Sequence, residues 1–283
     1  MPSSIKLSSA ATRDFWEIPV LFEDEHLLAL DKPPLLLTSP DRADPERPSL
    51  LKLLHQHIER GVPWATTRAL NYLMIAHRLD FETSGVLLLA KSKPVLIALA
   101  DLFGSERIIL KYAALVQGVP PEETMLTEAK LAPVEPPRSP RSDAAEDRLA
   151  FSTAILYQLR VDERRGKRSK TEFQIRERFA GYTLLECRPF THRPHQVRAH
   201  LRHLRLPISG DAAYGGSPLL LSQLKSEYRL KPQKTERPLI SNAAIYAEEL
   251  SLPHPMTGAQ ITITAPCPKD FAVALKYLRR YAS

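Results

Sequence analysis

The sequence predicts an α+β protein with a mixed, mostly antiparallel sheet and flanking helices. Short apolar segments recur along the chain and end at glycine, proline or charged residues, as strands do. A few amphipathic stretches lie between them, and their apolar spacing is typical of helices. The length of 283 residues and the hydrophobic content of 43% are sufficient for a sizeable core.

Each predicted element has its own local signal. The apolar run that starts at His26 stops at Pro33, and the run 85–92 suits a buried strand. Further strands are expected near 111–118, 151–160, 170–179, 182–190, 239–250 and 259–266. Helices are expected at 48–60, with Ser49 as the N-cap, and at 93–106, 195–206 and 269–282. The proline-rich, charged stretch 119–148 is expected to be irregular.

We expect a tail over residues 1–17 and a single folded domain over 18–283, since there is no internal repeat or clear linker. The Ser-rich start would also fit a transit peptide, but a frayed tail is the simpler interpretation. No apolar run is long enough to predict a membrane span, and no signal peptide is recognisable. Two cysteines cannot build a disulfide framework, so we expect a cytoplasmic protein. The net charge of +7 indicates a polyanionic partner.

Asp80 is the first candidate for chemistry. It follows Arg78 in the string HRLDFETSG at 77–85, directly before the apolar run. A turn role is the plain alternative, because Asp, Thr, Ser and Gly are ordinary loop residues. However, a carboxylate beside apolar strands needs a compensating cation, and that cation is expected to come from elsewhere in the chain.

The segment 190–204 is rich in histidine and arginine. His200 and His203 are three residues apart, and Cys187 is near, so a metal site is one alternative. The segment contains no Asp or Glu, and its arginines would repel a divalent cation. An arginine cluster at a helix start is better suited to phosphate or carboxylate.

Two further segments are weaker signals. Tyr112 opens an apolar strand, where core packing is the usual role of a tyrosine. The glycine-rich turn 207–216 contains Asp211 and Tyr214 but lacks the patterns of nucleotide phosphate loops. Neither nucleotide hydrolysis nor dinucleotide redox chemistry is therefore indicated.

Taken in order, five segments resemble the RluA-type RNA pseudouridine synthases. They are HRLDFETSG, KYAALVQG, GKRSKTEF, HRPHQVRAHL and GDAAYGG, and the stretch 252–271 also fits that family. The resemblance covers roughly residues 18–271. It implies a fold with a curved antiparallel sheet that binds RNA. It also implies an enzyme that isomerises uridine to pseudouridine in rRNA or tRNA, with neither cofactor nor metal.

The resemblance also implies roles for individual residues. The essential aspartate of the family falls on Asp80, the active-site tyrosine on Tyr112, and the arginine that pairs with the aspartate on Arg198. Arg78 is suited to fill the gap that a flipped uridine leaves in its stack. Other RNA contacts are expected at His77, Thr83, Arg193 and Gln196. The basic turn adds phosphate contacts through Arg164, Arg165, Lys167, Arg168 and Lys170, with a solvated hairpin as the alternative.

The chain departs from the family pattern at two places. His192-Arg193-Pro194 and Ile245-Tyr246-Ala247 replace the usual Gly-Arg-Thr and Leu-His-Ala. About 17 residues precede the catalytic pattern, too few for the S4 module of many relatives, so we expect the domain to select RNA unaided as a monomer. A non-catalytic RNA-binding protein and a metallohydrolase are the competing functions, and the joint presence of Asp80, Tyr112 and Arg198 disfavours the first.

Overall fold

The computed structural model describes residues 4–9, 11–41, 44–134, 158–230 and 233–282. Contacts divide the chain into two compact units. The first comprises Met1–Tyr112 and Tyr246–Pro266, and the second comprises Ala113–Ile245 and Cys267–Ser283. The division falls within β6 (Ile109–Gln117) and after the first residue of β12 (Ile245–Pro253). A single domain over 18–283 remains a prediction.

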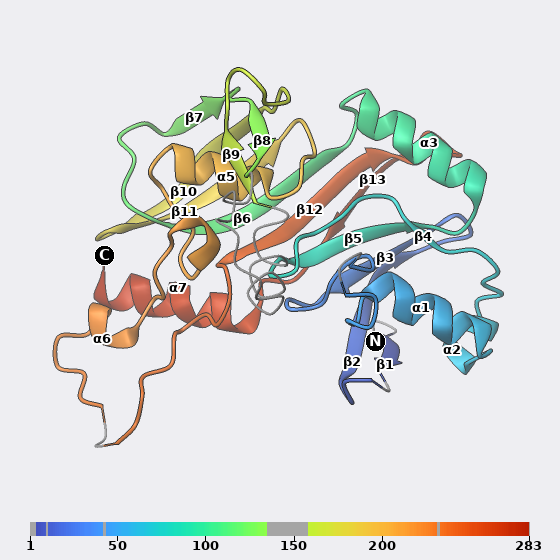
Figure 1. Cartoon of the computed structure of the whole chain (residues 1–283), viewed down its shortest axis with the longest axis horizontal. Coiled ribbons are helices and arrows are strands. Elements are labelled where there is room, and N and C mark those ends of the chain that lie inside the picture. Colours follow the sequence, from blue (N-terminus) through green and yellow to red (C-terminus); the bar gives the residue numbers. More distant parts are fainter. Residues whose placement is uncertain (1–3, 10, 42–43, 135–157, 231–232, 283) are drawn as a thin grey trace, which may run out of the picture. The chain divides into compact units, whose positions relative to one another are not determined.

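The first unit is built on a mixed sheet. Besides most of β12, its strands are β1 (Ser4–Ser8), β2 (Phe15–Glu23), β3 (Leu27–Lys32), β4 (Met74–Ile75), β5 (Ser84–Ala90) and β13 (Gln260–Thr264). The order is β1-β2-β3-β5-β12, with β4 beside β5 and β13 beside β12. Only β12 and β5 pair in parallel among the pairs described in this unit. Its helices are α1 (Leu50–Glu59), α2 (Pro63–Thr66) and α3 (Lys93–Gly104), with α1 against β1 and α3 against β5 (Figure 1).

Local sequence explains the central elements of this unit. Every residue of β5 is buried, as its continuous apolar run predicted. β3 ends at Lys32, where Pro33 removes the next backbone donor. α1 begins after Ser49, whose hydroxyl accepts a hydrogen bond from the Lys52 amide, so the predicted N-cap is confirmed.

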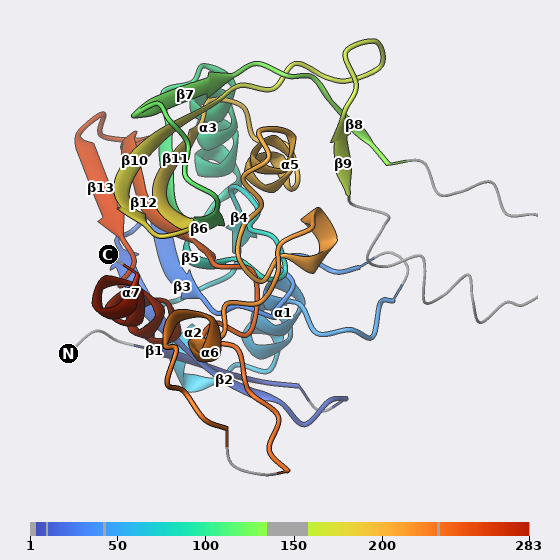
Figure 2. The ribbon, with the colours of Figure 1, turned by 90° about the vertical axis from the view of Figure 1, so that its left-hand side faces the viewer.

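The second unit is also built on a sheet. Its strands are the end of β6, β7 (Thr124–Thr127), β10 (Thr171–Phe179) and β11 (Tyr182–Pro189), in the order β6-β11-β10-β7 (Figure 2). In this sheet β10 pairs antiparallel with both β11 and β7. β8 (Leu131–Pro133) and β9 (Leu159–Val161) pair separately. The helices are α5 (Gln196–His203), the 3₁₀ turn η1 (Ala212–Tyr214), α6 (Leu221–Leu224) and α7 (Lys269–Tyr281).

The α+β class and the mostly antiparallel sheet are confirmed, and several segments differ from expectation. The predicted N-terminal tail contains β1, which pairs with β2, and neither strand was predicted. The prediction of an irregular stretch was wrong for 124–127 and 131–133, where β7 and β8 form by pairing with distant strands. Most of the predicted strand 151–160 lies outside the described residues. Among the described helices, none has the length and apolar character needed to cross a lipid bilayer.

Candidate active site

The loop that carries Asp80 joins β4 to β5 and is anchored along one edge by the segment 32–38. The Thr38 hydroxyl donates to the Leu79 carbonyl at 2.6 Å. The Leu35 amide donates to the Phe81 carbonyl at 2.8 Å. The Lys32 ammonium donates to the Thr83 carbonyl at 2.8 Å. The anchors fall on every second loop residue, so the backbone around Asp80 is fixed while Asp80 itself is only half-buried.

Lys32 is a fully buried cation close to this loop. Its side chain is 0% exposed, and its ammonium also donates to the Pro33 carbonyl at 2.9 Å. Burial lowers the pKa of Lys32 to about 7, and the charges of Asp80 and Asp31 oppose that shift. Burial likewise raises the pKa of Asp31 to about 6, against the Gly85 amide and the Lys32 charge. Asp80 therefore interacts electrostatically with a buried lysine of its own unit, whose protonation changes near neutral pH.

Lys32 gives a pH-dependent prediction. Its pKa is about 7 when folded and 10.5 as a model value, so between these values the unfolded chain binds more protons. The Lys32 contribution to the free energy of unfolding should therefore rise with pH, by up to about 1.4 kcal/mol per pH unit. Urea unfolding of wild type and Lys32→Met at about pH 7.5 and pH 9.5 measures the change in the free energy of unfolding between the two pH values, which the linkage relation assigns to proton binding. The rise should be smaller in the variant, and equal rises would contradict a neutralised buried lysine.

The backbone conformation and close packing of Gly85 explain why the TSG string ends in glycine. Its φ is +107°, and an added Cβ would lie 2.1 Å from the Ala247 carbonyl oxygen. Gly85 and Ala247 face each other in the parallel pairing of β5 with β12. Only glycine lets the two strands approach so closely where the loop enters the sheet.

The other predicted residues of this loop take different positions. His77 Nε2 accepts a hydrogen bond from the Leu88 amide at 3.1 Å, and its ring lies 5.6 Å from that of Phe103. Thr83 is 2% exposed and lies within the anchored edge. Both residues help to fix the loop, whereas Arg78 is exposed and has no ion pair with a carboxylate of the described residues. RNA contacts by these three residues remain predictions.

Tyr112 lies on β6 and packs, partly buried, against the core of the first unit. The neighbouring Lys111 forms an ion pair with Glu249 at 3.0 Å. This environment supports the packing role that a tyrosine on an apolar strand usually has. A catalytic role for Tyr112 remains a prediction.

In the second unit, Arg198 forms a bidentate ion pair with Asp211 of the glycine-rich turn. Its Nε and Nη2 donate to the two oxygens of Asp211, each at 2.7 Å, and the side chains are 5% and 0% exposed. The guanidinium carbon lies 5.0 Å from the ring centroid of Tyr214. The Tyr214 hydroxyl in turn accepts from the Leu159 amide at 2.9 Å and bonds His195 Nδ1 at 3.1 Å. A guanidinium has five donors, so this bidentate pair is compatible with a second anion.

Asp211 is the partner of Arg198 that the sequence analysis missed. The turn GDAAYGG was singled out, but the partner expected for Arg198 was Asp80 alone. Asp211 occupies two donors of the arginine, and the proposed pair between Arg198 and Asp80 remains a prediction. The available signal was the single carboxylate of a turn that follows the arginine-rich helix.

The turn before α5 is organised by Gln196. Its Oε1 accepts from the Arg193 amide at 3.1 Å and from the Thr191 hydroxyl at 2.8 Å. Its Nε2 donates to the Lys170 carbonyl at 3.0 Å and to the Thr171 hydroxyl at 2.9 Å. The side chain is 3% exposed, so a direct RNA contact would break bonds that hold the turn. Arg193 is exposed and better placed to contact RNA.

His200 is a buried structural histidine. Its Nδ1 lies 2.9 Å from the Thr171 hydroxyl and its Nε2 lies 3.0 Å from the Ala129 carbonyl oxygen. Burial lowers the pKa of His200 and raises that of the Cys187 thiol. Within the part of the chain that the structure describes, no three His, Cys, Asp or Glu side chains are grouped to hold a metal ion.

The basic turn is a tight, exposed loop. The Arg164 and Arg165 amides donate to Asp162 Oδ1 at 3.0 and 2.9 Å, and these bonds lower the pKa of Asp162. An added Cβ at Gly166 would meet the Asp162 carbonyl at 2.4 Å. The side chains predicted to contact phosphate, those of Arg164, Arg165, Lys167 and Arg168, belong to exposed residues. Lys170 pairs with Glu128 at 3.1 Å, and the phosphate contacts of the basic turn remain predictions.

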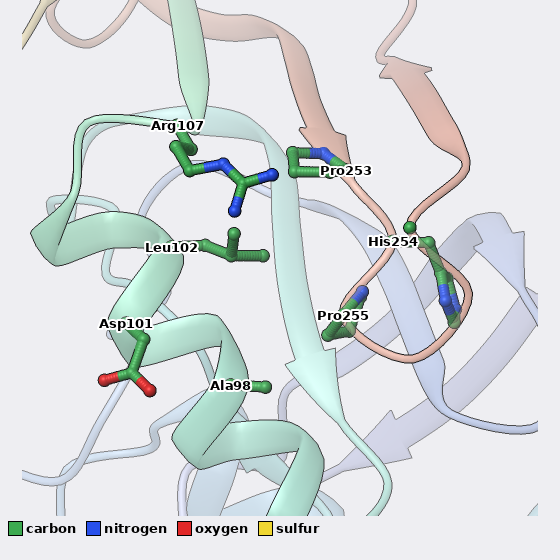
Figure 3. Close-up of a pocket in the computed structure, with 8 residues that line it drawn as sticks. Ala98, Asp101, Leu102, Arg107, Pro253, His254 and Pro255 are labelled. Atoms are coloured by element: carbon green, nitrogen blue, oxygen red, sulfur yellow. The ribbon is translucent and has the colours of Figure 1, made fainter.

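A separate hollow of about 290 Å³ lies in the first unit, between α3 and the turn that joins β12 to β13 (Figure 3). Leu102 and Arg107 face Pro253 across it, whereas the Asp101 carboxylate points away. His254 is fixed beside it by a 3.0 Å contact with Asp24. None of the predicted site residues lines this hollow.

Comparison with known proteins adds independent information. A family model described as RNA pseudouridylate synthase matches residues 26–203, a range that includes Asp80, Tyr112 and Arg198. Ribosomal large subunit pseudouridine synthase D of Xylella fastidiosa is 32% identical over 263 residues, which cover 93% of this chain and 70% of the relative. Ribosomal large subunit pseudouridine synthase C of Buchnera aphidicola is 30% identical over 266 residues, covering 92% and 70%.

A solved structure shares the fold. Human RNA Pseudouridylate Synthase Domain Containing 4 superposes with a TM-score of 0.62 and 22% sequence identity, and the match covers 92% of each chain. At this identity the likeness concerns the fold alone.

Proposed function

Because the chain belongs to the family of RNA pseudouridine synthases and isomerises uridine to pseudouridine in RNA, we propose that its substrate is ribosomal RNA and that Asp80 is its catalytic carboxylate. The substrate proposal is supported by the relative from Xylella fastidiosa, which matches 93% of this chain and is named for the large ribosomal subunit. The proposal includes a monomeric enzyme that works in the cytoplasm.

The observation that carries the assignment of Asp80 is the anchored loop. Three contacts with the segment 32–38 fix its backbone at Leu79, Phe81 and Thr83. A half-buried carboxylate on a fixed backbone meets the requirement that a reacting group be held in place before substrate arrives.

The reaction explains why a carboxylate is needed. The bond between uracil N1 and ribose C1′ breaks, the base turns, and C5 bonds to C1′. The proton of C5 leaves and N1 is protonated, so no atom is gained or lost. A carboxylate can attack the sugar, accept a proton from it, or stabilise positive charge developing on it. Arg198, as the proposed cation for Asp80, would keep that carboxylate ionised.

The substrate proposal is tested with purified protein on protein-free large-subunit rRNA and on bulk tRNA. Pseudouridine, mapped by carbodiimide modification and primer extension, should form in rRNA at defined positions and not in tRNA. Conversion confined to tRNA would overturn the choice of substrate. Binding of both RNAs without conversion would support the non-catalytic alternative.

The basic turn gives a prediction about binding. Replacing Arg164, Arg165, Lys167 and Arg168 by serine should weaken RNA binding and leave turnover at saturating RNA within about twofold, because these exposed cations are proposed to contact phosphates and not the reacting uridine. The slope of log affinity against log salt should fall by about 0.7 for each lost contact to single-stranded RNA. Fluorescence anisotropy across a salt series measures the slope, and an unchanged slope would identify the turn as a solvated hairpin.

A further inference from the structure

One cation in the first unit lies against the residue that follows the proposed catalytic carboxylate. The guanidinium carbon of Arg47 lies 4.4 Å from the ring centroid of Phe81. Arg47 belongs to the segment between β3 and α1, and its amide donates to the side chain and the carbonyl of Asp44, each at 3.2 Å. A short turn thus presents an arginine beside the Asp80 loop.

Arg47 has no counter-charge among the described residues. No carboxylate of these residues lies within ion-pair distance of it. Arg68, a second partly buried arginine of the same unit, is instead held by both oxygens of Glu23 at 3.0 Å. Stacking on Phe81 uses the face of the guanidinium and leaves its in-plane N–H groups available to a ligand. The ligand that matches such an edge in this family of RNA enzymes is a phosphate.

The same loop residue is contacted by a strained, exposed leucine. Leu35 has φ +59° in the left-handed region, which costs a leucine roughly 1 kcal/mol or more. Its amide donates to the Phe81 carbonyl at 2.8 Å, yet its side chain is 50% exposed and does not belong to the core cluster of this unit. Backbone strain at an exposed residue outside the core is typical of functional positions.

We propose that Arg47 and Leu35 form a binding site for a nucleotide adjacent to the target uridine. Arg47, stacked on the ring of Phe81, binds the phosphate of that nucleotide. Leu35 packs against the base or ribose of the same nucleotide. An arginine, an aromatic ring and an exposed apolar side chain are the combination that binds unstacked RNA. The site rests on the proposed function, because it takes Asp80 as the position of the target.

The test uses Arg47→Ala, with Arg280→Ala as the matched control. Arg280 stacks on Tyr281 of α7 at 5.3 Å, so each variant removes one stacked arginine and one charge. Arg47→Ala should raise the KM for large-subunit rRNA about 10-fold, the effect of one charged hydrogen-bonded contact, with kcat within about twofold. Arg280→Ala should leave both within about twofold, and both variants should keep a melting temperature close to that of the wild type, since a single cation–π pair that is not fully buried stabilises little.

Two further variants sharpen the result. Arg47→Lys keeps the charge but loses the planar edge, so it should retain the salt dependence of binding and recover only part of the affinity. Leu35→Gly relieves the backbone strain, so its melting temperature should be unchanged or higher while RNA affinity falls. A gain or maintenance of stability with a loss of affinity is not expected of a structural residue.

Binding is measured in the Asp80→Asn background, where RNA is not converted. If Arg47→Ala and Arg280→Ala give the same Kd for RNA and the same salt slope in that background, the proposal is overturned. The proposal is also overturned if Arg47→Ala lowers the melting temperature together with the RNA affinity, because Arg47 would then stabilise the Asp80 loop and not bind RNA. A wild-type protein that converts no RNA would contradict the proposed function, and the binding comparison would still decide the role of Arg47.

Discussion

Replacing Asp80 by asparagine is expected to abolish pseudouridine formation while RNA affinity stays within a few-fold of wild type. The substitution keeps the shape of the side chain and removes the charge. The loop should remain in place, because its anchors are the carbonyls of Leu79, Phe81 and Thr83 rather than the side chain of Asp80. RNA affinity should persist because phosphate contacts supply most of it. Single-turnover conversion and anisotropy measure the two quantities.

Asp101→Asn is the matched control. Asp101 is exposed on α3 of the same unit, and its carboxylate points away from the hollow beside it (Figure 3). The control should convert RNA at the wild-type rate, while Asp80→Asn should lose at least about 10³-fold, as expected when an essential nucleophile or base is removed. Turnover by Asp80→Asn within about 10-fold of wild type would reject Asp80 as the catalytic carboxylate.

Replacing Asp211 by leucine is expected to destabilise the protein by about 3–5 kcal/mol, because it leaves the buried Arg198 charge without its bidentate partner. The double variant Arg198→Met/Asp211→Leu replaces the whole pair with apolar groups and should recover most of that loss. Turnover should not recover, since the proposed cation for Asp80 is then absent. Urea unfolding and single-turnover conversion of the three proteins separate fold from chemistry.

The exposed pair of Arg279 with Glu177 is the control for this experiment. It has the same bidentate form, with a shortest distance of 2.7 Å, but side-chain exposures of 55% and 33%. Glu177→Ala should cost less than about 1 kcal/mol, because solvent screens the pair. If the double variant regains both stability and turnover, Arg198 has a structural role only.

Much of the fold could be predicted because its signals are local. The apolar run of β5, the proline after β3 and the Ser49 cap of α1 each report a short stretch of chain, and each was confirmed. β7 and β8 could not be predicted, since their stretch is rich in proline and charge and forms strands only through partners far away in sequence.

The residues of the candidate site also separate into those that a local sequence pattern could identify and those that only the folded structure reveals. The string HRLDFETSG identified the loop and its aspartate, because residue types at fixed spacing are visible in one segment. Lys32 was missed because the sequence marks it only as the end of a strand that stops at Pro33, and only the packed structure reveals that its ammonium is enclosed. Asp211 was missed for a related reason: a turn carboxylate acquires its partner only when the chain is folded.

The anchoring of the Asp80 loop has a consequence for how such an enzyme could change its target. The hydrogen bonds described between the segment 32–38 and the loop involve main-chain groups of the loop, at Leu79, Phe81 and Thr83. The identity of those side chains therefore contributes little to holding the loop. Mutation at Phe81 or Glu82 can alter the surface offered to a new RNA while the reacting carboxylate keeps its place, so target preference and catalytic competence can evolve separately.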